Sequence, residues 1–282
     1  MQQAPSTSGI QVANWSWKVV RTFVREHFGQ VLCSRSCLNY LHRLDFVLKR
    51  PKKRLLKADA AAREAFVAIY VALLAEAQET GAKIFFVDEA HFRADGDLRA
   101  KWVLRGEPAV VDSTSPRLGE KTTYYSGICL ETGEVEVMEV TENCTAETST
   151  AFLQQVRKNH TAPLIIVWDN GPAHRGEAIR TYLKTADLHL RLEALPAYSP
   201  DFNADEAIWD WARDEVTANT CFGTAAMVRE KLNAFFAGLA DRTAEVQQRC
   251  RTKLQAQADA VTATADRLSA QTKHVDLTLR SV

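Results

Sequence analysis

Apolar residues follow two different patterns along this chain of 282 residues. From Ala58 to Glu79 they recur at helical spacing in an alanine-rich segment, and after Gly81 they form short β-branched runs that are typical of buried strands. We expect strands over 84–88, 122–130, 134–140, 164–168 and 190–195, helices over 146–159, 173–185, from about 204 and over 243–270, an inserted hairpin around 102–104, and a tail beyond Thr272. Three antiparallel strands followed by alternating helices and strands predict a mixed α/β sheet.

This strand order is that of a ribonuclease H-like mixed sheet flanked by helices. In such a sheet the strand over 84–88 is central and the strand over 164–168 lies beside it. Asp88 and Asp169, which follow these two apolar runs, would then face each other at one sheet edge. The helix that opens near Asn203 would bring Glu206 to the same place.

A carboxylate at the end of a buried strand is costly unless a cation meets it. Asp and Glu oxygens are hard ligands that suit Mg²⁺ or Mn²⁺. Two such ions support in-line phosphoryl transfer without a covalent protein nucleophile. We therefore predict that Asp88, Asp169 and Glu206 are catalytic residues that hold two Mg²⁺ (or Mn²⁺) ions.

Each acid also has a structural alternative. Asp169 precedes Asn170-Gly171-Pro172, which is a strong turn signal. Asp205 competes with Glu206, because adjacent helical residues point about 100° apart and only one faces the site. Glu89, Asn170 and His174 are auxiliary candidates: His174 either polarises a phosphate or is a structural histidine at a helix start.

Residues 14–57 predict a helix-turn-helix, or winged-helix-like, DNA-binding module. A helix from Trp15 to Phe28 ends at Gly29, a second helix opens at Ser34-Arg35-Ser36, and 44–48 is a candidate wing strand. Candidate contacts to base edges are Arg35, Ser36 and Asn39, and candidate phosphate contacts are Lys49, Arg50, Lys52, Lys53 and Arg54.

The charge distribution supports this division, although the net charge of the whole chain is zero. Residues 1–83 carry thirteen Lys/Arg and six Asp/Glu, whereas residues 84–282 carry twenty-two and twenty-nine. A basic segment joined to an acidic body fits a DNA-contacting module beside a metal-binding one. The alternative is an ordinary solvated basic face. We expect a module over 14–57, a linker helix over 58–81, a catalytic domain over 82–240, and a C-terminal helix and tail over 241–282.

Other function classes find no support in the sequence. No apolar run approaches the roughly 20 residues of a membrane helix. The Gly-x-Ser-x-Gly, Gly-x-Gly-x-x-Gly and phosphate-loop motifs are missing. Six scattered cysteines without a Cys-x-x-Cys pair predict reduced thiols and a cytoplasmic protein.

Three phrases carry a family resemblance: 87–92 (VDEAHF), 168–174 (WDNGPAH) and 195–209 (LPAYSPDFNADEAIW). With them the chain resembles transposases of the Tc/mariner superfamily, in its bacterial insertion-sequence branch. The family's catalytic acids correspond to Asp88, Asp169 and Glu206. The family usually reads Asn-Pro-Ile-Glu where this chain has Asn203-Ala204-Asp205-Glu206, so the proline that pre-sets the helix start is replaced.

The resemblance implies a ribonuclease H-like fold, Mg²⁺ or Mn²⁺, cleavage of double-stranded DNA at terminal inverted repeats, and strand transfer into target DNA. Pairing of two ends implies a homodimer in the DNA complex. Family members usually carry two N-terminal helix-turn-helix units, and this chain has room for the second alone. Two alternatives therefore stay open: a truncated, inactive DNA-binding remnant, and a ribonuclease H-like nuclease of RNA–DNA hybrids.

Overall fold

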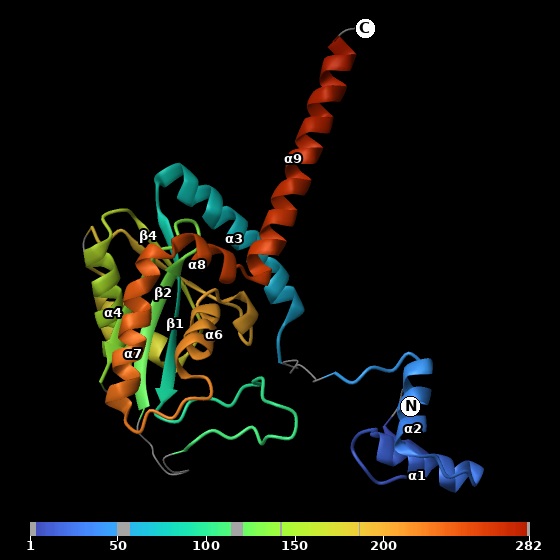
Figure 1. Cartoon of the computed structure of the whole chain (residues 1–282). Coiled ribbons are helices and arrows are strands. Elements are labelled where there is room, and N and C mark those ends of the chain that lie inside the picture. Colours follow the sequence, from blue (N-terminus) through green and yellow to red (C-terminus); the bar gives the residue numbers. More distant parts are fainter. Residues whose placement is uncertain (1–3, 50–56, 114–120, 142, 186, 281–282) are drawn as a thin grey trace. The chain divides into compact units, whose positions relative to one another are not determined.

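The computed structural model describes residues 4–49, 57–113, 121–141, 143–185 and 187–280 (Figure 1). The chain divides into two compact units, residues 1–54 and residues 55–282. The first unit contains a short 3-10 turn and two helices, and the second contains a five-stranded sheet with its helices.

The first unit has the two helices that the sequence predicts. Helix α1 (Trp17–Phe28) begins after Ser16, whose side chain accepts the N–H of Val19, and ends at Gly29 in the left-handed conformation (φ +64°). Helix α2 (Ser34–Arg43) is capped by the Cys33 thiol, which accepts the N–H of Ser36, so the cap lies one residue earlier than the serine run suggests. A 3-10 turn, Pro5–Ser8, precedes both helices.

The predicted wing strand over 44–48 is absent from the structure: residues 44–49 contain no strand. Asp45 has a positive φ of 59°, which turns the chain immediately after α2. Leu48 is fully exposed, as expected where its backbone is not part of a sheet. Lys49 is exposed, and Arg50, Lys52, Lys53 and Arg54 lie outside the described residues.

The second unit is built on a mixed sheet of order β3-β2-β1-β4-β5. Strand β2 is antiparallel to both of its neighbours, β1 and β3, whereas β4 and β5 run parallel to β1. This topology confirms the predicted mixed ribonuclease H-like sheet. The strands are β1 (Lys83–Arg93), β2 (Lys121–Cys129), β3 (Val135–Val140), β4 (Leu164–Trp168) and β5 (Leu190–Ala194).

Helices cover both faces of this sheet (Figure 1). Side chains of α4 and α5 pack with Phe85, Val87 and Ile166 on one face, and side chains of α3, α6, α7, α8 and α9 pack with Phe86 and Val167 on the other. The helices are α3 (Ala60–Thr80), α4 (Ala146–Asn159), α5 (Glu177–Tyr182), α6 (Glu206–Ala212), α7 (Ala225–Gly238), α8 (Thr243–Arg249) and α9 (Lys253–Arg280), with shorter turns at Pro172–His174, Pro200–Phe202, Arg213–Thr217 and Leu239–Asp241.

The first and last helices of this unit, α3 and α9, contact each other. Helix α3 buries Phe66 and Tyr70 in the core, and the Tyr70 hydroxyl donates to Gln255 Oε1 of α9 at 2.7 Å. The segment predicted as a linker is therefore part of the packed unit. Helix α9 continues to Arg280 and extends away from the sheet, so the tail expected beyond Thr272 is helical (Figure 1).

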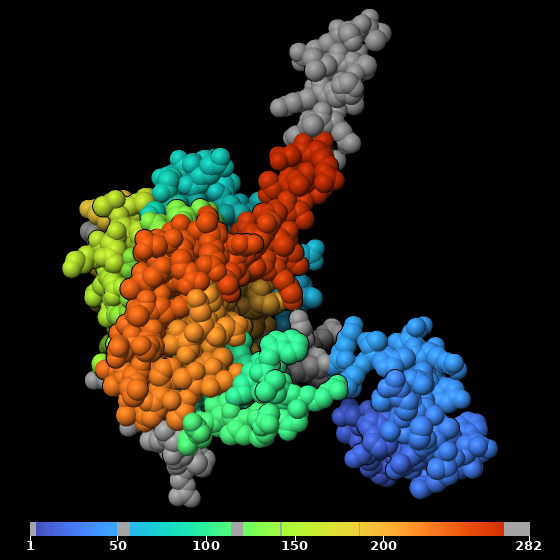
Figure 2. All heavy atoms as spheres, viewed as in Figure 1, coloured from blue at the N-terminus to red at the C-terminus, as the bar shows by residue number. Residues whose placement is uncertain are grey.

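Two further expectations are wrong. Residues 96–113 contain no strand, so the predicted hairpin around 102–104 is a loop at the surface (Figure 2). Trp102 in this loop is fully exposed. The helix expected over 173–185 is shorter, because a 3-10 turn at Pro172–His174 and extended backbone at Gly176 delay its start to Glu177.

Two further features of the chain are the state of its cysteines and the length and polarity of its helices. All six cysteines are free thiols. Within the described ranges, every helix is too short or too polar to cross a bilayer.

Candidate active site

Asp88 lies within β1 and beyond the end of its pairing with β4. Strand β1 pairs with β4 from Lys83 to Phe86 alone, but it continues with β2 as far as Arg93. The expectation that the strand ends at Asp88 is therefore wrong, since β2 carries it five residues further. Asp88 nevertheless lies where the sheet is open on one side: its backbone pairs with β2, but the pairing of β1 with β4 has already ended at Phe86.

The side chains of Asp88 and Glu89 point to opposite faces of the sheet, as neighbours on a strand must. Burial, helped by the nearby carboxylates of Glu206 and Glu89, raises the pKa of Asp88 to about 8. At neutral pH this carboxyl group binds a proton unless a cation replaces it. Such a group is typical of a cation site.

Asp169 follows the last residue of β4 and is held by its own turn. Its Oδ1 accepts the N–H of Gly171 at 2.7 Å and lies 2.8 Å from His174 Nδ1. The hydrogen bond from His174 is the main cause that lowers the pKa of Asp169. From the sequence, Asp169 could either form a turn or belong to the acidic site. In the structure the same side chain stabilises the turn and lines the acidic cavity.

His174 connects Asp169 to Glu89. Its ring is buried and stacks on Trp168 with centroids 4.4 Å apart, and its Nε2 lies 3.0 Å from Glu89 Oε2 in an ion pair whose angles fall short of a hydrogen bond. Burial by itself would lower the pKa of His174, but the two carboxylates raise it to about 9. The imidazolium form thus bridges Asp169 and Glu89.

Glu206 and Asp205 occupy different environments at the start of α6. Asp205 is completely buried, and Ser126 Oγ lies 2.6 Å from both of its carboxylate oxygens. Burial, followed by the charge of Asp88, raises the pKa of Asp205 well above its usual range. Glu206 is partly exposed, and burial raises its pKa as well. Of the two, Glu206 lines the cavity described next.

Asp88, Asp169 and Glu206 line one cavity of about 410 Å³. The residues that line it with them are Asn170, Gly171, Leu195, Pro196, Ala197, Tyr198, Ser199, Pro200 and Asn203. In this part of the described chain the cavity wall carries three carboxyl groups and no basic side chain. The structure therefore brings together the three acids that the sequence singles out, of which the first and the last are 118 positions apart.

Two asparagines replace the strand partners that are lost at this opening. Asn203 Nδ2 donates to the carbonyl of Val87 at 3.2 Å, and Asn170 Nδ2 donates to the carbonyl of Leu195 at 2.8 Å. Both contacts satisfy backbone oxygens of the sheet edge where no strand pairs with them. Asn170, which we predicted to be auxiliary, therefore has two roles: it lines the cavity, and its side chain holds the segment after β5.

A salt-bridge network behind the cavity could not be anticipated from the sequence. Asp201 accepts two hydrogen bonds from Arg63 of α3, at 2.8 and 3.0 Å, and a third from Lys253 of α9 at 2.8 Å. The Arg63 guanidinium also lies 3.9 Å above the ring of Phe202. These contacts fasten the segment 195–203, which forms much of the cavity wall, to two helices.

The donor set fits a hard divalent cation, because it consists of carboxylate, amide and hydroxyl oxygens. Across the described residues, however, no three His, Cys, Asp or Glu side chains already stand in the arrangement of a metal site. Asp169 Oδ1 is turned toward His174 and Gly171. Both contacts use the same oxygen, so Oδ2 is the atom left for an ion.

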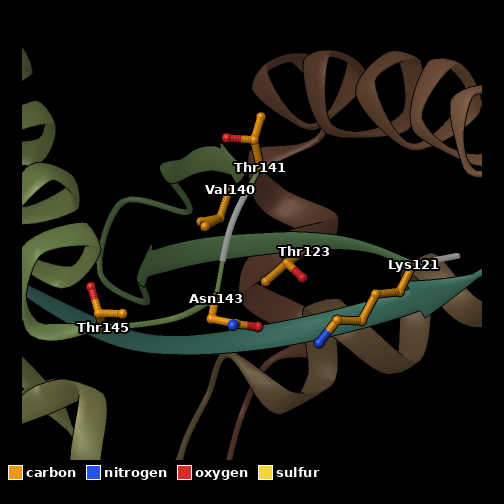
Figure 3. Close-up of a pocket in the computed structure, with 6 residues that line it drawn as sticks. All are labelled: Lys121, Thr123, Val140, Thr141, Asn143 and Thr145. Carbon is orange, nitrogen blue, oxygen red and sulfur yellow. The ribbon is translucent and has the colours of Figure 1, made fainter. Parts of the chain in front are cut away.

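A second cavity, of about 510 Å³, has a different character. It lies between β2, the end of β3 and the start of α4, and Figure 3 shows the side chains of Lys121 and Asn143 pointing toward each other across it. Thr123, Thr141 and Thr145 add hydroxyl groups to its lining. One cation among hydrogen-bond donors suits an anion, so this cavity differs in chemistry from the acidic one.

The predicted base-reading residues lie on α2. Arg35 and Asn39 are exposed there, as a DNA-reading helix requires, while Ser36 is half-buried and its Oγ lies 3.3 Å from Cys33 Sγ. Helix α2 therefore presents two of the three side chains freely.

Comparisons with known proteins show the family of the chain. Residues 83–229 match the sequence profile of the family described as DDE superfamily endonuclease, and residues 11–70 match a winged helix-turn-helix profile. The chain is also 25% identical over 226 residues to an uncharacterised 39 kDa protein of the insertion element IS630 from Shigella sonnei. That alignment covers 78% of this chain and 63% of the relative, so the chain spans less than two thirds of the relative's length.

Solved structures with a similar fold include those of the Mos1 transposase. The mariner Mos1 paired end complex with Mg has a TM-score of 0.61 and 17% identity, covering 92% of this chain and 84% of that one. The Mos1 strand transfer complex has a TM-score of 0.57 and 17% identity, covering 89% and 80%. The profile match spans more than half of the chain, which therefore belongs to the family of DDE superfamily endonucleases and, as its motifs predict, resembles the insertion-element branch of the Tc/mariner superfamily.

Proposed function

We propose that this protein is an insertion-sequence transposase that cuts the ends of its element and joins them to target DNA. The observation that carries the proposal is the cavity lined by Asp88, Asp169 and Glu206, in which burial and neighbouring carboxylates hold the pKa of Asp88 near 8. Family membership and the similarity to a protein of the element IS630 support the same chemistry.

The cofactor we propose is a pair of Mg²⁺ or Mn²⁺ ions held by the three acids. Mos1 complexes are known with Mg and with Mn, and the oxygen-rich lining of the cavity suits either ion. When bound, two divalent ions activate the attacking oxygen and stabilise the leaving oxygen of an in-line displacement.

The residues of this chain would prepare that chemistry in three ways. Asp88 would hold a cation in its deprotonated form, and the charge of the ion would offset the like-charge repulsion from Glu206. The His174 imidazolium and the Gly171 N–H hold Asp169 Oδ1, so that Oδ2 keeps a fixed direction. Asn203 joins the start of α6, and hence Glu206, to β1 through the carbonyl of Val87.

The DNA contacts belong to the proposal as well. Residues 14–57 would bind the terminal inverted repeats, with Arg35, Ser36 and Asn39 at base edges and the basic residues from Lys49 onward at phosphates. Residues 82–240 would cut and join, and two copies would pair the two ends in the cytoplasm. Helix α3, proposed from the sequence as a linker over 58–81, belongs to the catalytic body by its packing.

The test is cleavage of the DNA that flanks the gene, with Mg²⁺ or Mn²⁺ and with EDTA as the metal-free control. We expect Asp88→Ala, Asp169→Ala and Glu206→Gln to lose cleavage while binding the same DNA, and Glu230→Gln, an exposed acid on α7, to cut like the parent. If all three variants cut as well as the parent, the site is wrong. Binding without cleavage by the parent would indicate an inactive remnant, and cleavage of RNA–DNA hybrids alone would indicate a ribonuclease H-like nuclease.

A further inference from the structure

Tyr198 stands in an unusual position on the wall of the acidic cavity. Its backbone has a φ of +57°, in the left-handed region that residues other than glycine, asparagine and aspartate seldom adopt. Its side chain is 50% exposed although it lines the same cavity as Asp88, Asp169 and Glu206. A large aromatic residue thus adopts a disfavoured backbone conformation, and burial of its side chain does not offset the cost of that conformation.

The segment around Tyr198 explains how this conformation is maintained. Its neighbour Ser199 is buried, and Phe202 is buried beneath the guanidinium of Arg63. Asp201 is fixed to α3 and α9 by three hydrogen bonds, and the carbonyl of Leu195 is fixed by Asn170. Both ends of the segment are therefore anchored, and Tyr198 lies between them with its ring partly in solvent.

The surroundings of the ring favour a nucleic acid over other ligands. The acidic groups of the cavity would repel an anionic ligand in the absence of metal, but an aromatic face stacks on any base irrespective of charge. The ammonium group of Lys57 lies over the ring, 5.7 Å from its centroid. A flat apolar face next to a cation, at the entrance to a phosphoryl-transfer site, matches a nucleotide's base and phosphate.

We propose that Tyr198 is a stacking platform for one nucleobase of the DNA strand whose phosphate enters the acidic cavity. The inference rests on the proposed function, since it assumes DNA as the substrate. Stacking on the ring holds the strand end in place, and Lys57 contacts the adjacent phosphate. Because every base has an aromatic face, the platform positions the strand without reading its sequence.

The first test measures binding without metal, so that its outcome does not depend on cleavage. The probe is a short DNA duplex with a single-stranded 3′ extension, in which each base of the extension is replaced in turn by an abasic site. Tyr198→Ala should weaken binding by about 5- to 150-fold and Tyr198→Phe should bind like the parent. One abasic position should weaken the parent but leave Tyr198→Ala unaffected, because each change removes the same stacked pair.

A second variant separates this role from a structural one. Tyr198→Gly relieves the positive φ and should raise the melting temperature, yet it should bind the probe as weakly as Tyr198→Ala. Equal binding by the parent, Tyr198→Ala and Tyr198→Gly, or an abasic effect that is the same in the parent and in Tyr198→Ala, would overturn the stacking role.

Metal-dependent cleavage then distinguishes the two proposals. If the parent cuts with Mg²⁺ and Tyr198→Ala raises KM while keeping kcat, both proposals are supported. If Tyr198→Ala cuts with unchanged KM and kcat, the platform is refuted and the transposase proposal stands. If the parent does not cut but shows the abasic effect, the platform stands and the catalytic proposal fails.

Discussion

The ion-pair network around Asp201 gives the most quantitative prediction. Two hydrogen bonds from Arg63 and one from Lys253 meet this carboxylate, and the hydrogen bond from Arg63 is the main cause that lowers its pKa from 3.8 to about 2. Asp201→Asn keeps the shape of the side chain and removes its charge. We expect it to destabilise the folded protein at neutral pH.

The size of the effect follows from the shift in pKa. A change of just under two units corresponds to about 2.5 kcal/mol at full value. Because 34% of the Asp201 side chain and 21% of the Arg63 side chain are exposed, solvent screening reduces our expectation to about 1 kcal/mol. The folded pKa lies below the unfolded one, so this stability is complete above about pH 4 and is lost as the pH falls toward 2.

The assay is a double-mutant cycle in the free energy of unfolding, with Asp201→Asn, Arg63→Met and the double variant at pH 7. We expect a coupling energy of about 1 kcal/mol between the two positions. Glu177→Gln, which breaks the exposed pair with Arg180, is the control and should have almost no effect. A coupling energy near zero, or an Asp201→Asn variant as stable as the parent, would refute the view that this network fastens the cavity wall.

Three other substitutions test the remaining parts of the structure. Asp88→Asn should abolish cleavage and yet raise the melting temperature at pH 7, because it removes a carboxyl group whose charged form is disfavoured by burial; a calorimetric scan measures this, and a lower melting temperature would contradict it. His174→Asn should leave DNA binding intact but weaken Mn²⁺ binding by titration, since Asp169 loses its partner; unchanged affinity would speak against the positioning role. Gly133→Ala should destabilise the protein in denaturant unfolding by about 1–3 kcal/mol, because φ is +74° and the added carbon would lie 2.3 Å from the carbonyl oxygen of Thr243; a neutral result would contradict the turn geometry.

Much of the sheet was predictable from the sequence because its strands are short, apolar and separated by clear breaks. The antiparallel-then-parallel order follows from Gly133 in the turn and from the helix between β3 and β4. The three acids could be selected because two of them follow apolar, β-branched runs of the sequence. The length of β1 was not predictable, since its polar half from Asp88 to Arg93 is extended only through pairing with β2.

The rest of the site depends on contacts between distant residues. Arg63 and Asp201 are 138 positions apart, and nothing local marks either as a partner. Glu89 reads as a bystander beside Asp88, whereas its side chain reaches His174 through the opposite face of the sheet. Tyrosine has no preference for the left-handed region, so the conformation of Tyr198 is imposed by the anchored segment and leaves no signal in the sequence.

The separation of β1 and β4 after Phe86 has a mechanical consequence for the cavity. The backbone of Asp88 remains bonded to β2 and should exchange its amide hydrogens as slowly as the sheet core. Asp169 instead belongs to a turn beyond the end of β4, where its Oδ1 is held by the Gly171 N–H and by His174. The distance between the two acids can therefore change by rotation of that turn while the sheet stays still. We expect the cavity to adapt to successive DNA strands by movement of the turn that carries Asp169, while Asp88 on β1 stays in place.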